Sequence, residues 1–291
     1  MSTVSILGST GMLGYSVVRA FDGFAGSVTG SSKRVDTNPF LDQSFFLDAT
    51  VRELPQALHE LGPTDYVINC IGVIKPYISE DSAASRQRAL FINSVFPYAL
   101  DALANDLGFK IIQIATDCVF SGAKGKYLET DLHDATDTYG KTKSLGEVPS
   151  ENMMNIRVSI IGPEAGRSTS LFEWVRNQPK NSEINGYSDH YWNGVTSAGF
   201  ARICRGLIEN NGFVSGTHHL LPSDSMTKFD LVTEIAEKSG RKDIKIIKGP
   251  SGHKVDRTLA TTNESLNAQL WMNAGYLTIP RISELVAEIE L

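Results

Sequence analysis

The stretch Thr3-Val4-Ser5-Ile6-Leu7-Gly8-Ser9-Thr10-Gly11-Met12-Leu13-Gly14 decides the fold of this chain. An apolar, strand-like run leads into glycines at GxxGxxG spacing, and an amphipathic helix pattern follows. Glycines allow the sharp turn and the close backbone approach that a pyrophosphate needs, and the N–H groups at a helix start stabilise its charge. A glycine turn without a ligand is the alternative, but the order strand, loop, helix favours a dinucleotide site. We therefore predict cofactor contacts from Gly8, Thr10, Gly11, Met12, Leu13 and Gly14.

Strand-like and helix-period segments alternate through the first half of the chain, which predicts an α/β fold. We expect a Rossmann doubly wound parallel sheet with helices on both faces. Residues 1–162 should form this cofactor-binding domain and 163–291 mainly a smaller C-terminal substrate-binding region, with about 196–219 returning to the first domain. The expected strands lie near residues 3–8, 26–31, 65–70, 110–115 and 153–160, and the expected helices near 12–22, 50–60, 84–106 and 139–147.

Composition and charge exclude several classes of function. The chain has 291 residues and a net charge of -6, which argues against a general binder of nucleic acid or anionic membranes. We see no leader pattern and no apolar run long enough to cross a bilayer. Neither the separated cysteines nor the histidines show metal-ligand spacing. We expect a cytoplasmic protein without a metal, and a homodimer on general grounds.

The end of the second expected strand, Thr29-Gly30-Ser31-Ser32-Lys33-Arg34, bears on the choice of cofactor. An acidic residue there would bond a ribose 2′-hydroxyl and favour NAD. Hydroxyls and cations suit a 2′-phosphate instead, so we expect NADP(H), with NAD(H) as the alternative. The cations could equally belong to a solvated loop. The expected contacts are Ser31, Ser32, Lys33 and Arg34.

Tyr139 and Lys143 lie four residues apart at the start of an expected helix, so both side chains share one face. A tyrosine has a pKa of about 10, and a neighbouring cation lowers it by stabilising the phenolate. Tyr139 could then donate a proton to a carbonyl oxygen as a hydride reaches the carbon. Alone, this spacing also fits an ordinary surface helix. Thr116 strengthens the case, because the buried-strand run before it delivers its hydroxyl to the carboxyl edge of the sheet.

Together these motifs resemble the extended short-chain dehydrogenases, closest to the dTDP-4-dehydrorhamnose reductase group. The motifs are the glycine loop, Ala115-Thr116-Asp117-Cys118-Val119-Phe120-Ser121-Gly122, and Tyr139-Gly140-Lys141-Thr142-Lys143-x-x-Gly146-Glu147. The resemblance covers about the first 165 residues well. It implies Tyr139 as proton donor, Lys143 as a ligand of the nicotinamide ribose, and Thr116 as the group that orients the carbonyl. It further implies cofactor-side roles for Asp48, Ala49, Cys70, Ile71, Gly72 and Asn93, although Asn93 could be purely structural.

The residues after Thr116 bear on the reaction. Related dehydratases have an Asp-Glu pair there, whereas this chain has Asp117 and Cys118. The resemblance therefore implies NADPH-dependent reduction of a nucleotide-linked 4-keto-6-deoxyhexose, a step of polysaccharide precursor biosynthesis. Cys118 replaces the usual tyrosine and resembles the epimerising cysteine of GDP-fucose synthase, which leaves a bifunctional epimerase/reductase as an alternative. The other alternative is a non-catalytic NADP-binding regulatory subunit, because that of methionine adenosyltransferase resembles the same reductases.

The substrate side carries weaker signals. A nucleotide sugar needs cations for its diphosphate and aromatic rings for stacking. Arg257 lies in a segment that resembles one in which related enzymes bind the diphosphate. The expected substrate contacts are Asp117, Cys118, Val119, Arg157, Trp192 and Arg257, and any of the later ones could instead be ordinary core or surface residues.

Overall fold

The computed structural model describes residues 1–32, 39–50, 58, 61–164 and 169–290. Most of the helix expected near 50–60 lies outside these residues, as do Lys33 and Arg34. No helix in the described ranges is long and apolar enough to cross a membrane.

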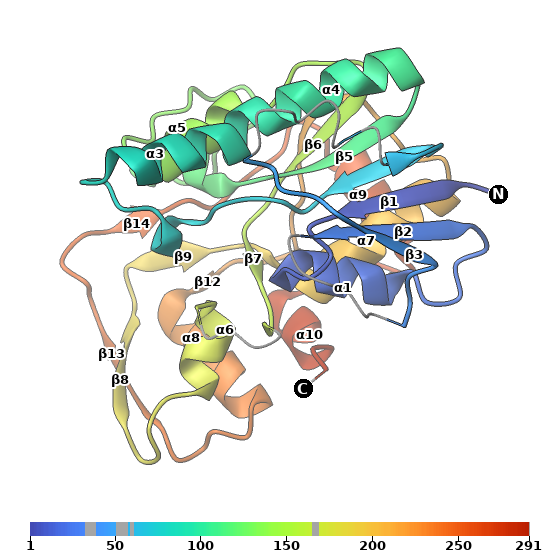
Figure 1. The fold of residues 1–291 in the computed structure, drawn as a ribbon. Coiled ribbons are helices and arrows are strands. Elements are labelled where there is room, and N and C mark those ends of the chain that lie inside the picture. Colours follow the sequence, from blue (N-terminus) through green and yellow to red (C-terminus); the bar gives the residue numbers. More distant parts are fainter. Residues whose placement is uncertain (33–38, 51–57, 59–60, 165–168, 291) are drawn as a thin grey trace.

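A seven-stranded parallel sheet forms the larger part of the molecule (Figure 1), in the strand order β11-β6-β5-β4-β1-β2-β3. The order reverses between β1 and β4, which places the topological switch point beside the glycine loop. The predicted doubly wound α/β fold is confirmed. The strands are β1 (Thr3–Leu7), β2 (Ser27–Ser32), β3 (Gln43–Phe46), β4 (Tyr66–Asn69), β5 (Lys110–Ala115), β6 (Met153–Arg157) and β11 (Gly216–His219).

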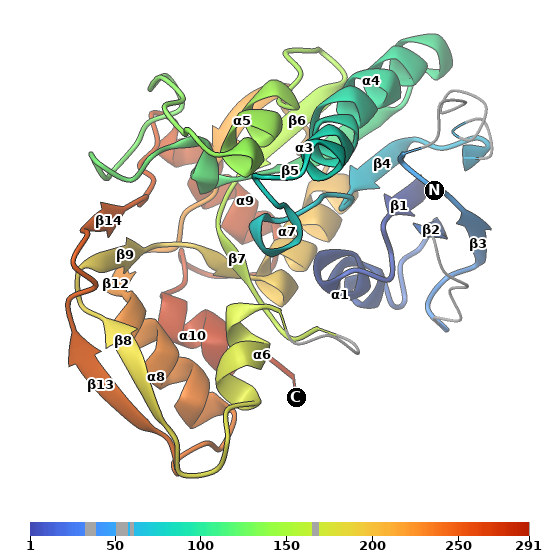
Figure 2. The ribbon, with the colours of Figure 1, turned by 60° about the vertical axis from the view of Figure 1, so that its left-hand side comes forward.

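The sheet is buried on both faces, because successive side chains of its strands are apolar and point to opposite faces. In β1, Ile6 packs into the layer of α1 (Met12–Ala20) and α7 (Ser197–Glu209), whereas Leu7 packs into the layer of α4 (Phe96–Leu107). Ile112 and Ile111 of β5 divide between the two layers in the same way. Figure 2 shows the two helix layers on opposite sides of the sheet.

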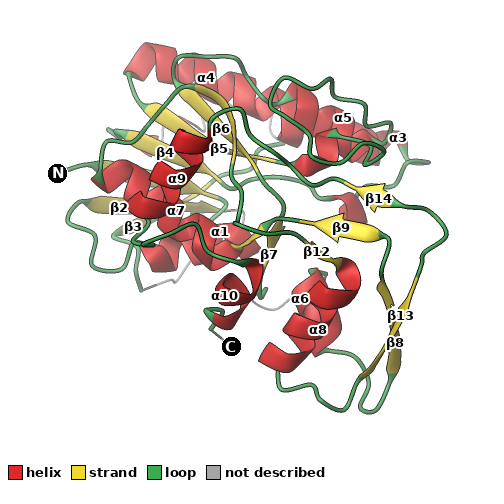
Figure 3. Cartoon of the chain, turned by 180° about the vertical axis from the view of Figure 1, so that it is seen from behind, coloured by secondary structure: helices red, strands yellow, loops and turns green. Residues whose placement is uncertain are grey.

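A smaller unit follows β6 and has its own core, built around Phe172, Leu231 and Ile235. The chain returns to the larger unit through α7, which packs on α1, and through β11, which pairs with β6. Figure 3 shows both units from behind. The remaining elements are β7 (Ile160–Ile161), α6 (Leu171–Arg176), β8 (Glu183–Tyr187), β9 (His190–Trp192), β10 (Val195–Thr196), β12 (Met226–Thr227), α8 (Lys228–Lys238), β13 (Lys245–Gly249), β14 (Val255–Asp256), α9 (Glu264–Asn273) and α10 (Ile282–Ala287).

The strand expected over 153–160 is shorter in the structure. It ends at Arg157, and Ile160–Ile161 leave the main sheet to pair with Val195–Thr196. This change of partner carries the chain from the larger unit into the smaller one.

The helix expected over 84–106 is interrupted by a π-helical turn at Phe91–Val95, between α3 (Ala83–Leu90) and α4. Such turns widen a helix locally and occur often at functional sites. Here the turn carries Asn93, whose side chain is buried. Its amide accepts a hydrogen bond from the N–H of Val73 (2.9 Å) and donates to the carbonyl of Val73 (3.0 Å) and the hydroxyl of Thr142 (3.1 Å). Asn93 thus ties the segment after β4 to α5 (Thr138–Leu145).

Gly146 ends α5 where its backbone touches the π-helical turn. A Cβ atom at this position would lie 1.9 Å from the carbonyl oxygen of Asn93. The backbone fixes the positions of both the Cβ atom and the Asn93 carbonyl, so no side-chain rotation can relieve the clash. Only glycine lets the two segments meet this closely.

We predict that Gly146→Ala lowers the free energy of unfolding by about 1–3 kcal/mol, because the two backbone segments must separate. Gly249→Ala is the control, since a Cβ atom there would meet nothing within 4 Å. It should change the stability by less than about 0.5 kcal/mol. Urea unfolding followed by circular dichroism measures both, and equal effects would contradict the argument.

Candidate functional site

The glycine loop brings the start of α1 directly against the end of β1. Gly8 has φ +80°, in the left-handed region that favours glycine. A Cβ atom on Gly14 would lie 2.1 Å from the carbonyl oxygen of Gly8, so the helix can begin this close only with glycine. Among the described residues, no side chain caps the start of α1. Its N–H groups and positive dipole end therefore remain available for an anion such as a pyrophosphate.

A cavity of about 740 Å³ lies over this loop. Its walls also include the end of β2, the segment after β3 and the segment after β4. Arg88 of α3 lines it too and was not expected from the sequence. The structure thus brings together eight of the expected cofactor residues: Gly8, Thr10, Gly11, Ser32, Ala49, Cys70, Ile71 and Gly72.

Three expected cofactor residues support this cavity without lining it. Ser31 is fully buried, and its carbonyl accepts the N–H groups of Gly8 and Ser9, which fixes the loop. The Asp48 carboxylate accepts hydrogen bonds from the N–H and hydroxyl of Thr50. Asn93 acts through the backbone of Val73, as described above.

A second cavity, of about 400 Å³, adjoins the first and shares Gly11, Gly72 and Tyr77 with it. Met12 and Leu13, which were expected as cofactor contacts, line this second cavity. We call it the catalytic cavity. It brings together Thr116, Asp117, Cys118, Tyr139 and Lys143, from the segment after β5 and from α5.

Thr116, Tyr139 and Lys143 form one constellation in this cavity. The Thr116 hydroxyl accepts the N–H of Cys118 at 3.2 Å and hydrogen-bonds the phenol of Tyr139. The Nζ atom of Lys143 donates to the carbonyl of Ile114 at 2.7 Å. A Cβ atom on Gly140 would lie 2.4 Å from the Cys118 carbonyl, so α5 packs against the turn after Thr116 through glycine. This close approach brings the phenol to the hydroxyl.

Desolvation sets the protonation of these groups. It raises the pKa of Tyr139, and the hydrogen bond from Thr116 offsets only part of this rise. Desolvation also lowers the pKa of Lys143 to about 8, against the opposing effect of the Glu147 carboxylate. Near neutral pH the phenol therefore holds its proton and the lysine remains mostly charged. The expected lowering of the Tyr139 pKa by a neighbouring cation is not found, because desolvation outweighs the lowering effects.

Asp117, Cys118 and Lys228 line another part of the cavity. Burial raises the pKa of Asp117, and the charges of Arg257 and Lys228 oppose that rise. Burial also raises the pKa of Cys118 to about 12, so its thiol stays protonated. Lys228 was not expected from the sequence, because a single lysine at a helix start carries no motif.

The whole chain is similar to one known family. The family model of the RmlD substrate binding domain matches residues 1–288. The chain belongs to this family. It is 27% identical over 248 residues to methionine adenosyltransferase 2 subunit beta of Rattus norvegicus, covering 80% of this chain and 71% of the relative. It is 24% identical over 250 residues to dTDP-4-dehydrorhamnose reductase of Escherichia coli (strain K12), covering 81% and 79%.

A solved structure of an RmlD-type reductase shows the same fold. The dTDP-4-dehydrorhamnose reductase of Bacillus anthracis, solved in complex with NADP, superimposes with a TM-score of 0.77. The match covers 99% of this chain and 98% of that one at 18% identity. The family resemblance expected from the motifs is confirmed.

Two expected substrate residues lie elsewhere in this RmlD-family chain. Val119 is fully buried and packs with Phe120, Tyr127 and Leu259, because the 3₁₀ turn after Thr116 directs it into a small core. Arg157 is also buried, and its guanidinium donates to the Glu147 carboxylate at 2.6–3.0 Å. Its charge is compensated inside the protein, which corrects the expectation of a substrate contact.

Arg257 and Trp192 lie closer to the expected chemistry. Trp192 lines the catalytic cavity. The Nε atom of Arg257 donates to the Phe120 carbonyl at 2.9 Å, and its charge acts on Asp117 and Cys118. Arg257 therefore shapes the electrostatics of this wall.

Two histidines complete the network around Arg157. The guanidinium meets Nε2 of His219 at 3.1 Å and Nε2 of His133 at 2.7 Å. An arginine can only donate, so each of these nitrogens must accept and both imidazoles must be neutral. Burial lowers the pKa of each imidazole, and the charge of Arg157 adds to this effect while Glu147 opposes it.

We predict that acid weakens the fold through these histidines. Their pKa values are lower in the folded chain than in the unfolded chain, so the unfolded chain binds protons first as the pH falls below about 6.5. The stability they contribute is complete above that pH and is lost below it. The wild type should lose more unfolding free energy between pH 7.5 and 5.5 than His133→Gln does.

The exposed His253 supplies the control for this measurement. His253→Gln should show the same loss between the two pH values as the wild type. Urea titrations of the three proteins at each pH give six unfolding free energies and hence three differences between the two pH values. An identical pH dependence of His133→Gln and wild type would refute the role of His133.

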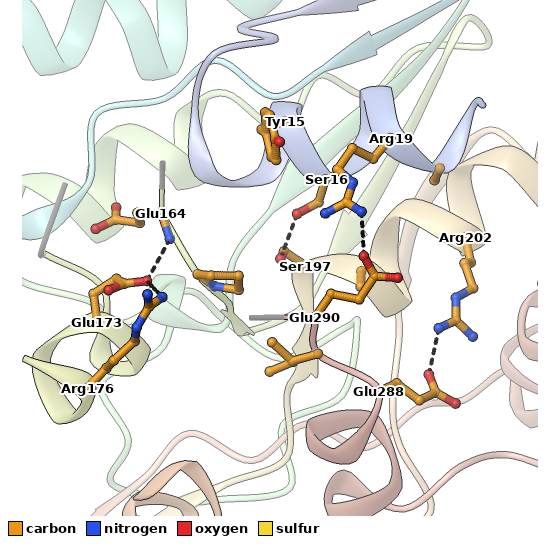
Figure 4. Close-up of a pocket in the computed structure, with 14 residues that line it drawn as sticks. Tyr15, Ser16, Arg19, Glu164, Glu173, Arg176, Ser197, Arg202, Glu288 and Glu290 are labelled. Carbon is orange, nitrogen blue, oxygen red and sulfur yellow. Dashed lines mark hydrogen bonds and ion pairs between the residues drawn. The ribbon is translucent and has the colours of Figure 1, made fainter. Parts of the chain in front are cut away.

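A separate cavity of about 530 Å³ lies between α1, α6, α7 and the C-terminal segment (Figure 4). The hydroxyls of Ser16 and Ser197 join α1 to α7 at 2.8 Å. Its arginines are paired with carboxylates, so their charges are compensated. None of the expected site residues that the structure describes lines it. The pairs are Arg19 with Glu290, Arg176 with Glu173 and Arg202 with Glu288. In the described residues no cluster of histidine, cysteine or acidic side chains could hold a metal ion.

Proposed function

We propose that the chain is an NADPH-dependent reductase of a nucleotide-linked 4-keto-6-deoxyhexose, serving polysaccharide precursor synthesis. The observation that carries this proposal is the constellation of Thr116, Tyr139 and Lys143 in a cavity that adjoins the glycine-loop cavity. The name of the Escherichia coli relative supports the same substrate class. Its similarity to this chain extends over both units of the structure.

The cofactor fits the residues of the glycine-loop cavity. The uncapped start of α1 would hold the pyrophosphate, and Gly8 and Gly72 let the backbone come close. Ser32 lies where a 2′-phosphate is expected in this fold, which supports NADP(H) over NAD(H). The structurally similar dTDP-4-dehydrorhamnose reductase of Bacillus anthracis was solved in complex with NADP.

The mechanism follows from the protonation of the site. When NADPH is bound, it supplies the hydride that reaches the carbonyl carbon. Thr116 orients the carbonyl oxygen, and Tyr139 donates its proton to that oxygen, so that a ketone becomes an alcohol. The charged Lys143, whose pKa is lowered to about 8 by desolvation, would hold the nicotinamide ribose. Solvent then returns the proton to the phenol.

We predict that Tyr139→Phe lowers kcat by about 10²- to 10⁴-fold, because the proton donor is lost. The dissociation constant for NADPH should stay within about twofold of wild type, since the ring remains and Lys143 is intact. The assay follows NADPH absorbance with dTDP-, UDP- and GDP-linked 4-keto-6-deoxysugars. Tyr98→Phe, at an exposed position of α4, is the matched control and should keep full activity. Undiminished turnover by Tyr139→Phe would exclude the proposed mechanism.

A second function is favoured by the 27% identity to methionine adenosyltransferase 2 subunit beta. The chain would then bind NADP and act as a subunit of a partner enzyme. Thr116, Tyr139 and Lys143 argue for chemistry, because a binding subunit needs no proton donor. Silence of the wild type across the sugar panel, together with a stable complex with a methionine adenosyltransferase catalytic subunit in gel filtration, would favour the subunit.

The epimerase/reductase alternative receives less support. Proton removal beside a ketone needs a thiolate, whereas burial holds the pKa of Cys118 at about 12. Turnover in deuterium oxide distinguishes the two reactions. Solvent deuterium at the carbon beside the reduced centre, absent in Cys118→Ala, would establish epimerisation.

A further inference from the structure

Lys228 lies at the junction of two cavities. It is the first residue of α8 and lines the catalytic cavity together with Asp117 and Trp192. It also lines a neighbouring cavity of about 450 Å³, formed by residues of α6, β8 and β9. Its Nζ atom sits 5.3 Å from the ring centroid of Trp192. The side chain therefore faces both spaces at once.

The charge of Lys228 is not matched by any described residue. Within the described part of the chain, its ammonium makes no hydrogen bond and no ion pair within 4 Å. Desolvation lowers its pKa to about 8, with the more distant Asp117 opposing that change. The start of a helix carries a positive dipole, so a lysine there is unfavourable unless an anion is close. The Trp192 ring and the more distant Asp117 act on this charge, but neither forms an ion pair with it in the described residues.

The neighbouring cavity has an aromatic lining. Trp174 and Tyr187 are both well exposed there, and the rings of Tyr187 and His190 lie 4.9 Å apart. Exposed rings of this kind suit a flat partner such as a nucleobase. A ligand that reached from the catalytic cavity into this one would have to pass the ammonium of Lys228.

We infer that Lys228 is a specificity-determining residue, whose ammonium binds a phosphate group of the substrate between the catalytic cavity and the aromatic cavity. This inference rests on the proposed function for the substrate class. The anion would stabilise the ammonium and the start of α8 together. The Asp117 carboxylate does not take the place of this anion. It lies beyond ion-pair distance of the Lys228 ammonium and is itself acted on by the charge of Arg257.

The test compares nucleotide binding by wild type, Lys228→Met and Lys228→Arg. Methionine keeps the length of the side chain and its packing on Trp192 but removes the charge. The probes are dTDP, UDP and GDP, with the uncharged nucleosides as references, measured by calorimetry on the NADPH-loaded protein. Lys242→Met, at an exposed lysine beyond α8, is the matched control.

We predict that Lys228→Met weakens binding of the preferred nucleoside diphosphate by about tenfold or more, because a charge-assisted bond is lost. Binding of the nucleoside should stay within twofold, and Lys228→Arg should keep most of the diphosphate affinity. Lys242→Met should behave as wild type. Equal melting temperatures of Lys228→Met and wild type would show that Lys228→Met is folded. If it is not folded, the diphosphate affinity of Lys228→Arg is the second measurement.

Each outcome bears on one proposal or on both. Equal diphosphate affinity in wild type and Lys228→Met would overturn the role of Lys228 and leave the reductase intact. No diphosphate binding by the wild type would overturn the role of Lys228 together with the substrate class. A Lys228-dependent affinity without NADPH oxidation on any sugar would support the phosphate site and count against the reductase.

Discussion

The buried amide of Asn93 holds together the segments that form the site. It pairs with both backbone groups of Val73, beyond the end of β4, and with the hydroxyl of Thr142 in α5. A buried backbone group without a partner costs about 1–3 kcal/mol, so Val73 needs this side chain where the sheet ends. The π-helical turn supplies it by interrupting an otherwise regular helix. Through this one side chain, the wall of both cavities and the helix of Tyr139 and Lys143 share a common support.

The desolvation of the site has two opposite consequences. It makes Tyr139 keep its proton, which suits a donor, but it also weakens the charge on Lys143. Glu147 counters the second effect, and Glu147 is held in place by Arg157. Because His133 and His219 are neutral, the Glu147 carboxylate compensates the charge of the Arg157 guanidinium. Arg157, which lines none of the four cavities described, thus acts on Lys143 through the Glu147 carboxylate that it orients.

The sequence predicts best the residues that are grouped by local spacing. The glycines of the loop and the pair Tyr139 and Lys143 each lie within a short stretch of chain, and the fold places them at two adjoining cavities. Arg157 was expected to contact substrate because its sequence does not show that Glu147, ten residues earlier, lies within 2.6–3.0 Å of its guanidinium in the fold. Val119 was expected to contact substrate, but it lies in a 3₁₀ turn and is buried against Phe120, Tyr127 and Leu259. Lys228 was missed because its meaning comes from two cavities that only the fold creates.

Lys143, which is buried, and Lys228, which is half-buried, line the same cavity, and neither makes an ion pair in the described residues. Burying a charge in this way opposes folding unless a ligand later compensates it. A protein that acted only through its outer surface would gain nothing from either lysine. A dinucleotide and a phosphate-bearing ketone would satisfy both, since the ribose hydroxyls can accept from Lys143 and a phosphate from Lys228. The placement of these two cations therefore favours a site that handles two ligands together over a single binding surface.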